Sequence, residues 1–558
     1  MSPKFLFSVF SQGIIPLLLA VSATAQNSGL TALNWQPDIP LLARKNYTPV
    51  WRLELVRPTG SVAYRLESLN FSFDGTRIPE DIVSVSLYQC GTDGLISTKR
   101  IGHPVPIRDG KGSILPGIEV DRDTLRVWVA ITLRESVSLD DPVYLTCTHI
   151  GTSCGDVDLS NLKPPRGLRR GVAVRLPLQD GIVGSRIPGL ATTPKGTLLA
   201  IFDARYDLRR DLQGHMDIAL HRSSDGGVTW QPLQVILDMG CWGGLPEKYN
   251  GVSDACIVVD DRTGHITVAA CWMYGIIDKR TGTWIEGLNE HSTVWEHQWS
   301  LPYASKAGWD VKECAQFIVT RSTDDGLTWS TPENLTSMVK PHDFRLYVPA
   351  PGRGITLSDG TLVMPTQGRT ADGTPFAAVL MSRDGGKSWE RPSDFAFLNG
   401  GECAIVELSD GSLMLNTNRR ANARLRAGAG NGRGVTVSRD GGRTWTEHPT
   451  SCKVLIEPPC EGSLLRHCYT VNGEKRSVLL FCNPNSDHAR VDLTIKVSFD
   501  EGMTWPEAYW TVIDELPGSG YSCMTSIGEE YVGVLFEGSQ ADLSFLRIPL
   551  QELLETKK

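Results

Sequence analysis

Four separate segments of the chain together supply arginine, carboxylate and tyrosine side chains, residue types that bind anions and move protons. They cover residues 185–230, 400–420, 481–505 and 520–538. Arginine is planar and permanently charged, so it suits bidentate binding of a carboxylate. A carboxyl group donates or accepts a proton during a reaction, and a tyrosine becomes a nucleophile once a base takes its proton. Together these segments could bind an anion and perform nucleophilic and acid–base chemistry.

Other catalytic patterns are missing from the sequence. No Ser-His-Asp arrangement, phosphate-binding glycine loop or metal-spaced histidine pair stands out. The 13 cysteines show no Cys-x-x-Cys or Cys/His ligand spacing. We therefore expect no metal and no cofactor, and we assign no disulfide. The net charge of −8, without a long basic run, argues against binding to nucleic acid.

Five copies of the pattern Ser-x-Asp-x-Gly-x-x-Trp, the Asp box, recur through the region that must position these residues. They read SSDGGVTW from Ser223, STDDGLTW from Ser322, SRDGGKSW from Ser382, SRDGGRTW from Ser438 and SFDEGMTW from Ser498. Successive copies are separated by 99, 60, 56 and 60 residues. The three shorter separations fit one four-stranded sheet with its loops, which is the spacing of β-propeller blades. The longest separation fits a blade with a long insertion.

Each Asp box also makes physical sense as a turn. Aspartate accepts hydrogen bonds from the amides that follow it, and glycine supplies a positive φ. Apolar alternation leads into most copies, as in GVTVSRDGG (residues 434–442), so each box is predicted to cap a β-hairpin. The tryptophan ring is expected beneath the loop, where its N–H needs a partner. The boxes themselves are structural and indicate nothing about chemistry.

The first residues have the pattern of a targeting segment. Lys4 precedes an apolar run from Ile14 to Val21, and Ala-Thr-Ala then fits a cleavage site before Gln26. We expect a signal peptide over residues 1–25 and an exported protein, either periplasmic or secreted; the alternative is an uncleaved anchor. No later segment is long enough to span a bilayer.

Two further regions follow the targeting segment. Residues 26–170 have no Asp box but contain short alternating strands, which favours a small β-sandwich that either binds carbohydrate or serves as a rigid spacer. Residues 161–171 are basic and contain proline, as a linker does. Strands with Gly/Asp/Asn turns continue through residues 171–558, and a short helix is expected from Leu550. The fold class is therefore all-β.

The four segments described first resemble the sialidase (neuraminidase) family of bacterial exo-glycosidases. The resemblance covers residues 181–538 and rests on SRIPGL, DARYDLRRD, GGECAIVELSDGS, NPNSDHARVDLT and GYSCM in this order. It implies a six-bladed β-propeller over residues 171–558. It also implies removal of terminal sialic acids from glycoproteins, gangliosides and oligosaccharides, by an enzyme expected to be a monomer. The N-terminal region is similar to an extra domain of some sialidases.

Three arginines are implied to hold the carboxylate of the sialic acid. They are Arg186, Arg419 and Arg490. The segment NTNRRANAR departs from the commoner spacing after the preceding Glu, so Arg420 is an alternative to Arg419.

The same resemblance assigns the chemical steps. Tyr521 is implied to be the nucleophile, because an anionic Asp or Glu would be repelled by the substrate carboxylate, and tyrosine is a known exception among glycosidases. Glu402 matches its base. Asp211 matches the general acid/base, and its offset of six residues from Arg205 favours it over Asp203, Asp207 and Asp217. A buried strand position is the alternative for Tyr521.

Supporting residues follow from the same match. Glu537 corresponds to the carboxylate that holds Arg186, although such pairs are also ordinary structural features. Arg205 and Asp254 match residues near the O4 hydroxyl of the sugar. Trp272 is a candidate wall for the N-acetyl group, with a core position as the alternative. His215 is interpreted as a loop residue.

The main hypothesis is a retaining exo-α-sialidase that acts through a covalent tyrosyl intermediate. One alternative is a trans-sialidase, transferring to another molecule or within the substrate, since it would use the same residues. The other is a non-catalytic glycan-binding propeller. The joint presence of Tyr521, Glu402 and Asp211 with the arginines favours catalysis, because a binding module needs no such set.

Overall fold

The structure is a computed structural model that describes residues 21–24, 30–57, 63–91, 94–121, 123–159, 166–212, 214–278, 280–294, 305–424 and 430–557. Most of the expected signal peptide lies outside these ranges; its residues Val21–Thr24 form strand β1. Among the described residues, no helix is both long and apolar enough to cross a membrane. The helices are short, as in α1 (Thr336–Val339) and the expected C-terminal α2 (Leu550–Leu554).

The chain divides into two compact units. The first comprises residues 1–37, 47–132 and 143–167, and the second comprises residues 38–46, 133–142 and 168–558. Strand β3 (Leu41–Ala43) belongs to the second unit because it pairs in parallel with β13 (Arg170–Arg175). The early part of the sequence therefore contributes an edge strand to the later unit.

The first unit contains two β-sheets. The six-stranded sheet has the order β1, β2 (Thr31–Trp35), β4 (Thr48–Val56), β10 (Thr124–Leu133), β6 (Ile82–Cys90) and β7 (Ile96–Pro106). The other has the order β12 (Val157–Asp158), β11 (Thr146–Thr152), β5 (Tyr64–Ser72) and β8 (Lys111–Ile114), with β9 (Ile118–Val120) also pairing with β5. Alternating exposure along β5 follows the expected pattern of one buried face.

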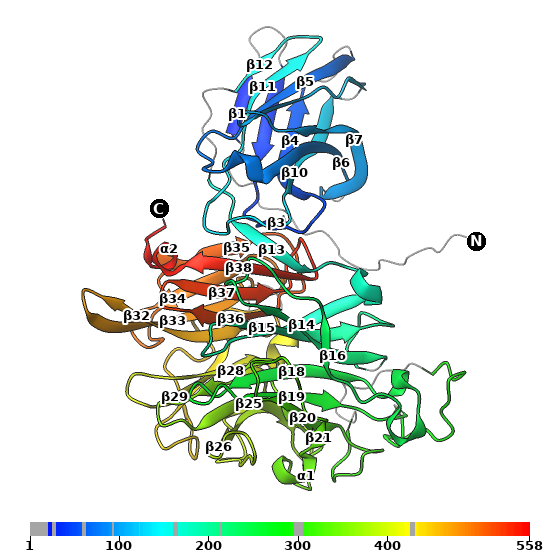
Figure 1. The fold of residues 1–558 in the computed structure, drawn as a ribbon, viewed down its shortest axis with the longest axis vertical. Coiled ribbons are helices and arrows are strands. Elements are labelled where there is room, and N and C mark those ends of the chain that lie inside the picture. The colour runs from blue at the N-terminus through cyan, green and yellow to red at the C-terminus, as the bar shows by residue number, and fades with distance from the viewer. Residues whose placement is uncertain are drawn as a thin grey trace. The chain divides into compact units, whose positions relative to one another are not determined.

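The second unit contains six sheets of four or five strands (Figure 1). The first sheet consists of β14 (Gly184–Thr192), β15 (Leu198–Arg205), β16 (Met216–Ser223) and β17 (Gln234–Leu237), and the second of β18 (Val252–Val259), β19 (Ile266–Trp272), β20 (Gln316–Ser322) and β21 (Glu333–Asn334) with β23 (Gly352–Arg353). The third sheet consists of β22 (Leu346–Pro349), β25 (Leu362–Arg369), β26 (Pro375–Ser382) and β27 (Phe397–Leu398) with β24 (Ile355–Thr356). The fourth consists of β28 (Gly400–Glu407), β29 (Leu413–Arg419), β30 (Gly434–Ser438) and β31 (Thr446–Glu447).

The last two sheets bring the two ends of this unit together. The fifth consists of β32 (Ser463–Val471), β33 (Glu474–Pro484), β34 (Leu493–Ser498) and β35 (Thr511–Asp514). The sixth joins β36 (Ser522–Ile527), β37 (Tyr531–Phe536) and β38 (Leu543–Pro549) to β13 and β3. Because β13 pairs with β38, strands from the start and the end of the unit share one sheet (Figure 1).

Apolar cores lie between successive sheets. Leu199 and Ile218 of the first sheet share a core with Ile257 and Val268 of the second, and the remaining neighbours share similar clusters. Since both faces of these sheets are covered, strands such as β18 are buried at every position. The expected alternation of buried and exposed residues is therefore lost in the inner strands.

The five Asp boxes occupy the predicted hairpin turns. Each connects the third strand of a sheet to the fourth, as in β16 and β17. In the first, Asp225 Oδ1 accepts from the amide of Thr229 at 2.9 Å, and Trp230 Nε1 donates to the carbonyl of Gly227 at 3.0 Å. The other four tryptophans donate to the equivalent glycine carbonyls.

Candidate active site

Strands β14, β18 and β28, each the first strand of its sheet along the chain, carry a β-bulge next to a polar residue of the site. The register of β14 shifts between Arg186 and Gly189, and similar shifts occur in β18 and β28. Ile187 has φ of 60° and Asp254 has φ of 58°, values that β-branched and other non-glycine residues rarely adopt. Bulges re-aim side chains, and backbone strain of this kind concentrates at functional sites.

Tyr521 and Glu402 meet at the centre of the site. The phenol of Tyr521 donates a short hydrogen bond to Oε1 of Glu402, and each residue is only 8% exposed. Burial, and then the negative charge of Glu402, raise the pKa of Tyr521 well above its usual value. A phenol with so high a pKa stays protonated unless a base accepts its proton as it reacts.

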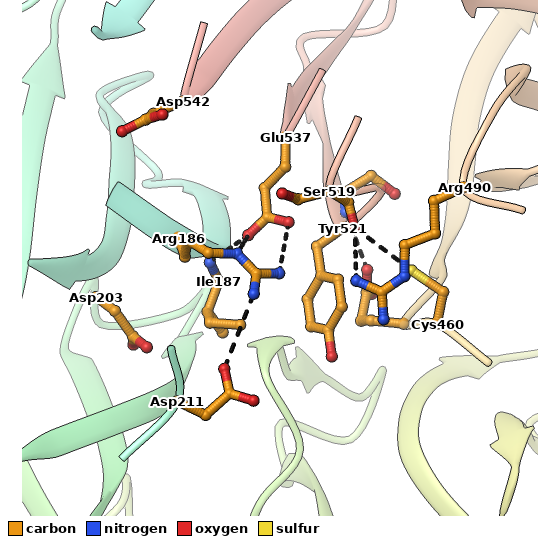
Figure 2. Close-up of polar contacts among 12 residues, drawn as sticks. Arg186, Ile187, Asp203, Asp211, Cys460, Arg490, Ser519, Tyr521, Glu537 and Asp542 are labelled. Carbon is orange, nitrogen blue, oxygen red and sulfur yellow. Dashed lines mark hydrogen bonds and ion pairs between the residues drawn. The ribbon is translucent and has the colours of Figure 1, made fainter. Parts of the chain in front are cut away.

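Two arginines flank the ring of Tyr521. The guanidinium carbons of Arg186 and Arg490 lie 5.3 Å and 5.4 Å from the ring centroid (Figure 2). Arg490 is held by the carbonyls of Ser519, at 2.8 Å, and Pro459, at 3.1 Å. Both cations oppose the rise in the pKa of Tyr521. They would therefore favour any negative charge that forms on its oxygen.

Glu537 fixes the position of Arg186. Its carboxylate accepts from Nε at 3.0 Å and from Nη2 at 2.8 Å, and it also accepts from the amide of Ile187 at 2.7 Å (Figure 2). Burial alone would lower the pKa of Arg186, but the adjacent Glu537 raises it above its usual value. This bidentate pair leaves Nη1 of Arg186 directed toward Asp211, 3.8 Å away.

Asp211 is the most accessible carboxylate of this group. Its side chain is 52% exposed and accepts from Nη1 of Arg205 at 3.0 Å. The three competing aspartates are engaged elsewhere. Asp203 is fully buried against Arg205, Asp207 accepts from the amide of His215 at 2.9 Å, and Asp217 lies 3.6 Å from the His215 ring.

Asp254 lies in the same pocket but in a different electrostatic environment. Its amide donates to Asp203 Oδ1 at 3.1 Å, and Ser253 Oγ donates to Asp203 Oδ2 at 2.7 Å. Burial, followed by repulsion from Asp203, Asp211 and Glu402, raises the pKa of Asp254 well above its usual value. Burial and the neighbouring carboxylates therefore favour the neutral form of Asp254, and a neutral carboxyl can donate a hydrogen bond to a ligand.

The structure separates Arg419 from Arg420. Arg420 lines the pocket and donates from Nη2 to Oε1 of Gln367 at 3.3 Å. Arg419 is absent from the described pocket wall; its amide donates to Oε1 of Glu457 at 2.8 Å. Of the alternatives left open by the sequence, the geometry favours Arg420.

Trp272 occupies a core position, the alternative considered for it. It is 1% exposed, packs edge-on against Trp242 at 4.8 Å between ring centroids, and donates to Asn250 Oδ1 at 3.3 Å. It is not part of the described pocket wall. The pocket contains the residues Ile187, Asp211, Asp254, Leu346, Gln367, Gly368, Arg369, Pro375, Gly400, Gly401, Glu402, Asn418, Arg420, Pro459, Arg490 and Tyr521.

Comparison with known proteins identifies the family of this chain. Residues 187–514 match the BNR repeat-like domain family. A sialidase of Bacteroides fragilis is 37% identical over 448 residues, which cover 80% of this chain and 76% of that protein. The chain belongs to the sialidase family. It is therefore a glycoside hydrolase that removes sialic acid.

One solved structure and a second sequence relative agree with this assignment. The Hadza microbial sialidase Hz136 superposes on the protein with a TM-score of 0.81 and 30% identity, covering 93% of this chain and 99% of that one. A sialidase of Micromonospora viridifaciens is 31% identical over 64% of this chain and 50% of its own length. The all-β class predicted for this sialidase is confirmed by its strands and by these matches.

Two residues of the sialidase site were not found by sequence reasoning. Asn418 lines the pocket and donates from Nδ2 to Oε2 of Glu402 at 2.7 Å. Glu461 is buried and accepts from the amide of Ser522, which follows Tyr521, at 2.9 Å. Asn418 lies in the segment NTNRRANAR, which was considered only for its arginines, and Glu461 lies outside the four segments. Within the described ranges, no cluster of His, Cys, Asp and Glu is suited to a metal ion.

Proposed function

We propose that this sialidase is a retaining exo-α-sialidase in which Tyr521 is the nucleophile. The observation that carries the proposal is the hydrogen bond from the buried Tyr521 hydroxyl to Glu402, with Arg186 and Arg490 on either side of the ring. A base positioned on the phenol and two fixed cations satisfy the requirements for activating such a weak nucleophile.

In the first step, Arg186, Arg490 and Arg420 hold the carboxylate of a terminal sialic acid. Glu402 takes the proton of Tyr521 as the phenolate oxygen attacks the anomeric carbon. The bond from that carbon to the glycosidic oxygen breaks, and the leaving oxygen takes a proton from Asp211. A carboxylate nucleophile would be repelled by the sialic acid carboxylate, which is attached to the carbon under attack. A neutral tyrosine with a separate base avoids this repulsion.

In the second step, a water molecule replaces the departed alcohol. Asp211 takes a proton from the water as its oxygen attacks the anomeric carbon, the bond to Tyr521 breaks, and Glu402 returns the proton to the phenol oxygen. Two displacements at the same carbon leave its configuration unchanged. The exposure of Asp211, 52% at the side chain, gives water access to the base.

The fold that supports this chemistry is proposed to be a six-bladed β-propeller. Six sheets, cores between successive sheets and contacts of β14 with both β18 and β36 support this architecture. We further propose that residues 26–170, apart from residues 38–46, 133–142 and 168–170 of the second unit, form a separate β-sandwich domain. We also propose that a signal peptide over residues 1–25 exports the enzyme to the periplasm or beyond.

The substrates are proposed to be glycoproteins, gangliosides and oligosaccharides with terminal sialic acid. The deciding experiment uses purified protein without residues 1–25 and an α-sialoside of methylumbelliferone, beside the variant Tyr521→Phe. Release by the parent but not by the folded variant is expected. Proton NMR of the first product should show the α-anomer. A first product of β-configuration, or full activity of the variant, would refute the mechanism.

Hydrolysis and transfer are separated by the same assay. With lactose added at high concentration, a hydrolase should still release free sialic acid as the main product. Sialyllactose as the main product would instead assign a trans-sialidase, and an anhydro sugar would assign intramolecular transfer.

A further inference from the structure

The side-chain amide of Asn418 lies directly behind the catalytic base. Asn418 is the penultimate residue of β29 and is 3% exposed. Its Nδ2 donates to Oε2 of Glu402 at 2.7 Å, while Oε1 of the same carboxylate accepts from Tyr521. The amide thus turns its NH2 group toward Glu402, whose two oxygens both accept hydrogen bonds. Its oxygen then points the other way.

That oxygen is left without a partner. Within the described part of the chain, Oδ1 of Asn418 is buried and accepts no hydrogen bond. A buried acceptor left unsatisfied costs about 1–3 kcal/mol, so such atoms are rare in native proteins and need an explanation. Because Asn418 lines the substrate pocket, the explanation to consider is a donor that arrives when the pocket is filled.

The guanidinium of Arg420 lies near this oxygen, on the other side of Gly401. A methyl group built on Gly401 would lie 2.8 Å from Asn418 Oδ1, 2.8 Å from Arg420 Nε and 3.1 Å from its Nη2. The amide oxygen and the guanidinium therefore approach the same small space, which only glycine leaves open. Arg420 is exposed and is held by Gln367 at 3.3 Å, a long hydrogen bond.

We propose that Asn418 is a positioning residue that couples substrate binding by Arg420 to the base Glu402, an inference that rests on the proposed function. When the sialic acid carboxylate draws in the Arg420 side chain, a guanidinium N–H is donated to Asn418 Oδ1. The amide NH2 then holds Oε2 of Glu402 more firmly and keeps Oε1 on the phenol of Tyr521. Chains of hydrogen bonds strengthen one another in this way inside proteins.

The substitution Asn418→Asp tests the hydrogen bond from the amide NH2 group to Glu402. It keeps the shape of the side chain and the oxygen that faces Arg420. It places a second carboxylate against Glu402, so at neutral pH two anions meet where one hydrogen bond stood. We expect kcat to fall by about 10- to 100-fold, less than the loss of the base itself. As pH falls, a proton shared by the two carboxyls restores a hydrogen bond between residue 418 and Glu402, and the activity relative to wild type should recover.

Three measurements keep the inference falsifiable. The matched control is Asn472→Asp, in the exposed hairpin turn between β32 and β33, which should leave the pH–rate profile unchanged. Asn418→Leu should lower kcat at every pH and move the acid limb of the profile to higher pH. In a double-mutant cycle, the effects of Asn418→Leu and Arg420→Ala should be non-additive, because each substitution breaks the same series of hydrogen bonds.

The outcomes also separate this inference from the proposed function. If the wild type does not release sialic acid, the proposed function fails. If it is active but Asn418→Asp loses the same fraction of kcat at every pH, or the cycle is additive, Asn418 is only structural and the coupling is refuted. Thermal unfolding of each variant identifies losses that come from misfolding.

Discussion

The hydroxyl of Tyr521 donates a hydrogen bond to Oε1 of Glu402, a residue 119 positions earlier in the chain. Tyr521 immediately precedes the first strand of the last sheet, while Glu402 lies on a bulged strand of the fourth. Two different sheets thus hold the nucleophile and its base, and the fold of the whole second unit is needed to align them. Glu402 lies on a strand and Tyr521 directly next to one, so the distance between them depends little on loop motion.

Removing the hydroxyl should separate catalysis from folding. Tyr521→Phe retains the ring between Arg186 and Arg490 but has no nucleophilic oxygen, so kcat should fall by at least about 10³-fold. The aromatic contacts remain, so the unfolding temperature should stay close to that of the wild type. Initial rates with methylumbelliferyl sialoside and a thermal melt test both points. A variant that keeps a tenth of the wild-type rate would contradict the role assigned to Tyr521.

Breaking the Arg186–Glu537 pair should cost stability as well as activity. Glu537 is 2% exposed, and Glu537→Ala leaves the Arg186 guanidinium without its bidentate partner. Loss of one member of a buried pair costs about 3–5 kcal/mol. Urea unfolding measures this change. The control Glu333→Ala removes an exposed partner of Arg321 and should cost less than about 1 kcal/mol.

The two adjacent arginines should differ in kinetics. Arg420→Ala removes a guanidinium from the pocket, so KM for a sialoside should rise and kcat/KM should fall by roughly 10- to 100-fold. Arg419 donates to Glu457 through its backbone, a bond that survives Arg419→Ala. The KM of the Arg419→Ala enzyme should therefore stay close to that of the wild type. If the effects of the two substitutions were reversed, Arg419 would be the carboxylate ligand.

The repeated parts of this fold were predictable from sequence, because Asp boxes combine turn chemistry with regular spacing. The sequence did not predict the bulges that turn Glu402 and Asp254 into the pocket, since they depend on strand register. Nor did it predict which strands are buried on both faces. Trp272 shows the same limit, since the sequence pattern of an apolar residue in a strand fits a core position and a pocket wall equally well.

The candidate site was predictable only to the level of motifs. The resemblance supplied residue types in the right order, but neighbouring side chains such as Arg419 and Arg420 differ in direction rather than type. Asn418 lies beside these arginines in NTNRRANAR, but only the three-dimensional arrangement shows its hydrogen bond to Glu402.

His215 should make stability depend on pH. Its ring stacks on Tyr206 at 4.2 Å and lies near the carboxylates of Asp217 and Glu247, and its backbone amide donates to Asp207. The hydrogen bond with Asp217 is the largest cause that raises the pKa of His215 above its usual value. The stabilisation from the charged ring is complete below the unfolded pKa of about 6.5 and disappears as pH rises through the higher folded pKa.

The substitution His215→Gln removes this contribution. It should lower the unfolding temperature more at about pH 5.5 than at about pH 8.5, because the ring is charged only at the lower value. Differential scanning fluorimetry at both pH values gives the comparison. The matched control His291→Gln alters a side chain that is 87% exposed and should show the same small change at both. An equal loss for His215→Gln at both pH values would contradict the charged-ring account.

The acid/base role of Asp211 predicts a dependence on the leaving group. The coumarin phenol leaves readily without full protonation, whereas the sugar alcohol of sialyllactose needs a proton from Asp211 as the bond breaks. Asp211→Ala should therefore reduce kcat/KM on sialyllactose by about 10²- to 10⁴-fold and on the coumarin substrate by a much smaller factor. Asp207→Ala is the control, because Asp207 accepts from the backbone of His215 and does not line the pocket. Any loss that it causes should be equal for both substrates, since it would come from the loop that holds Asp211. A leaving-group effect in Asp207→Ala instead of Asp211→Ala would transfer the proton-donor role to Asp207.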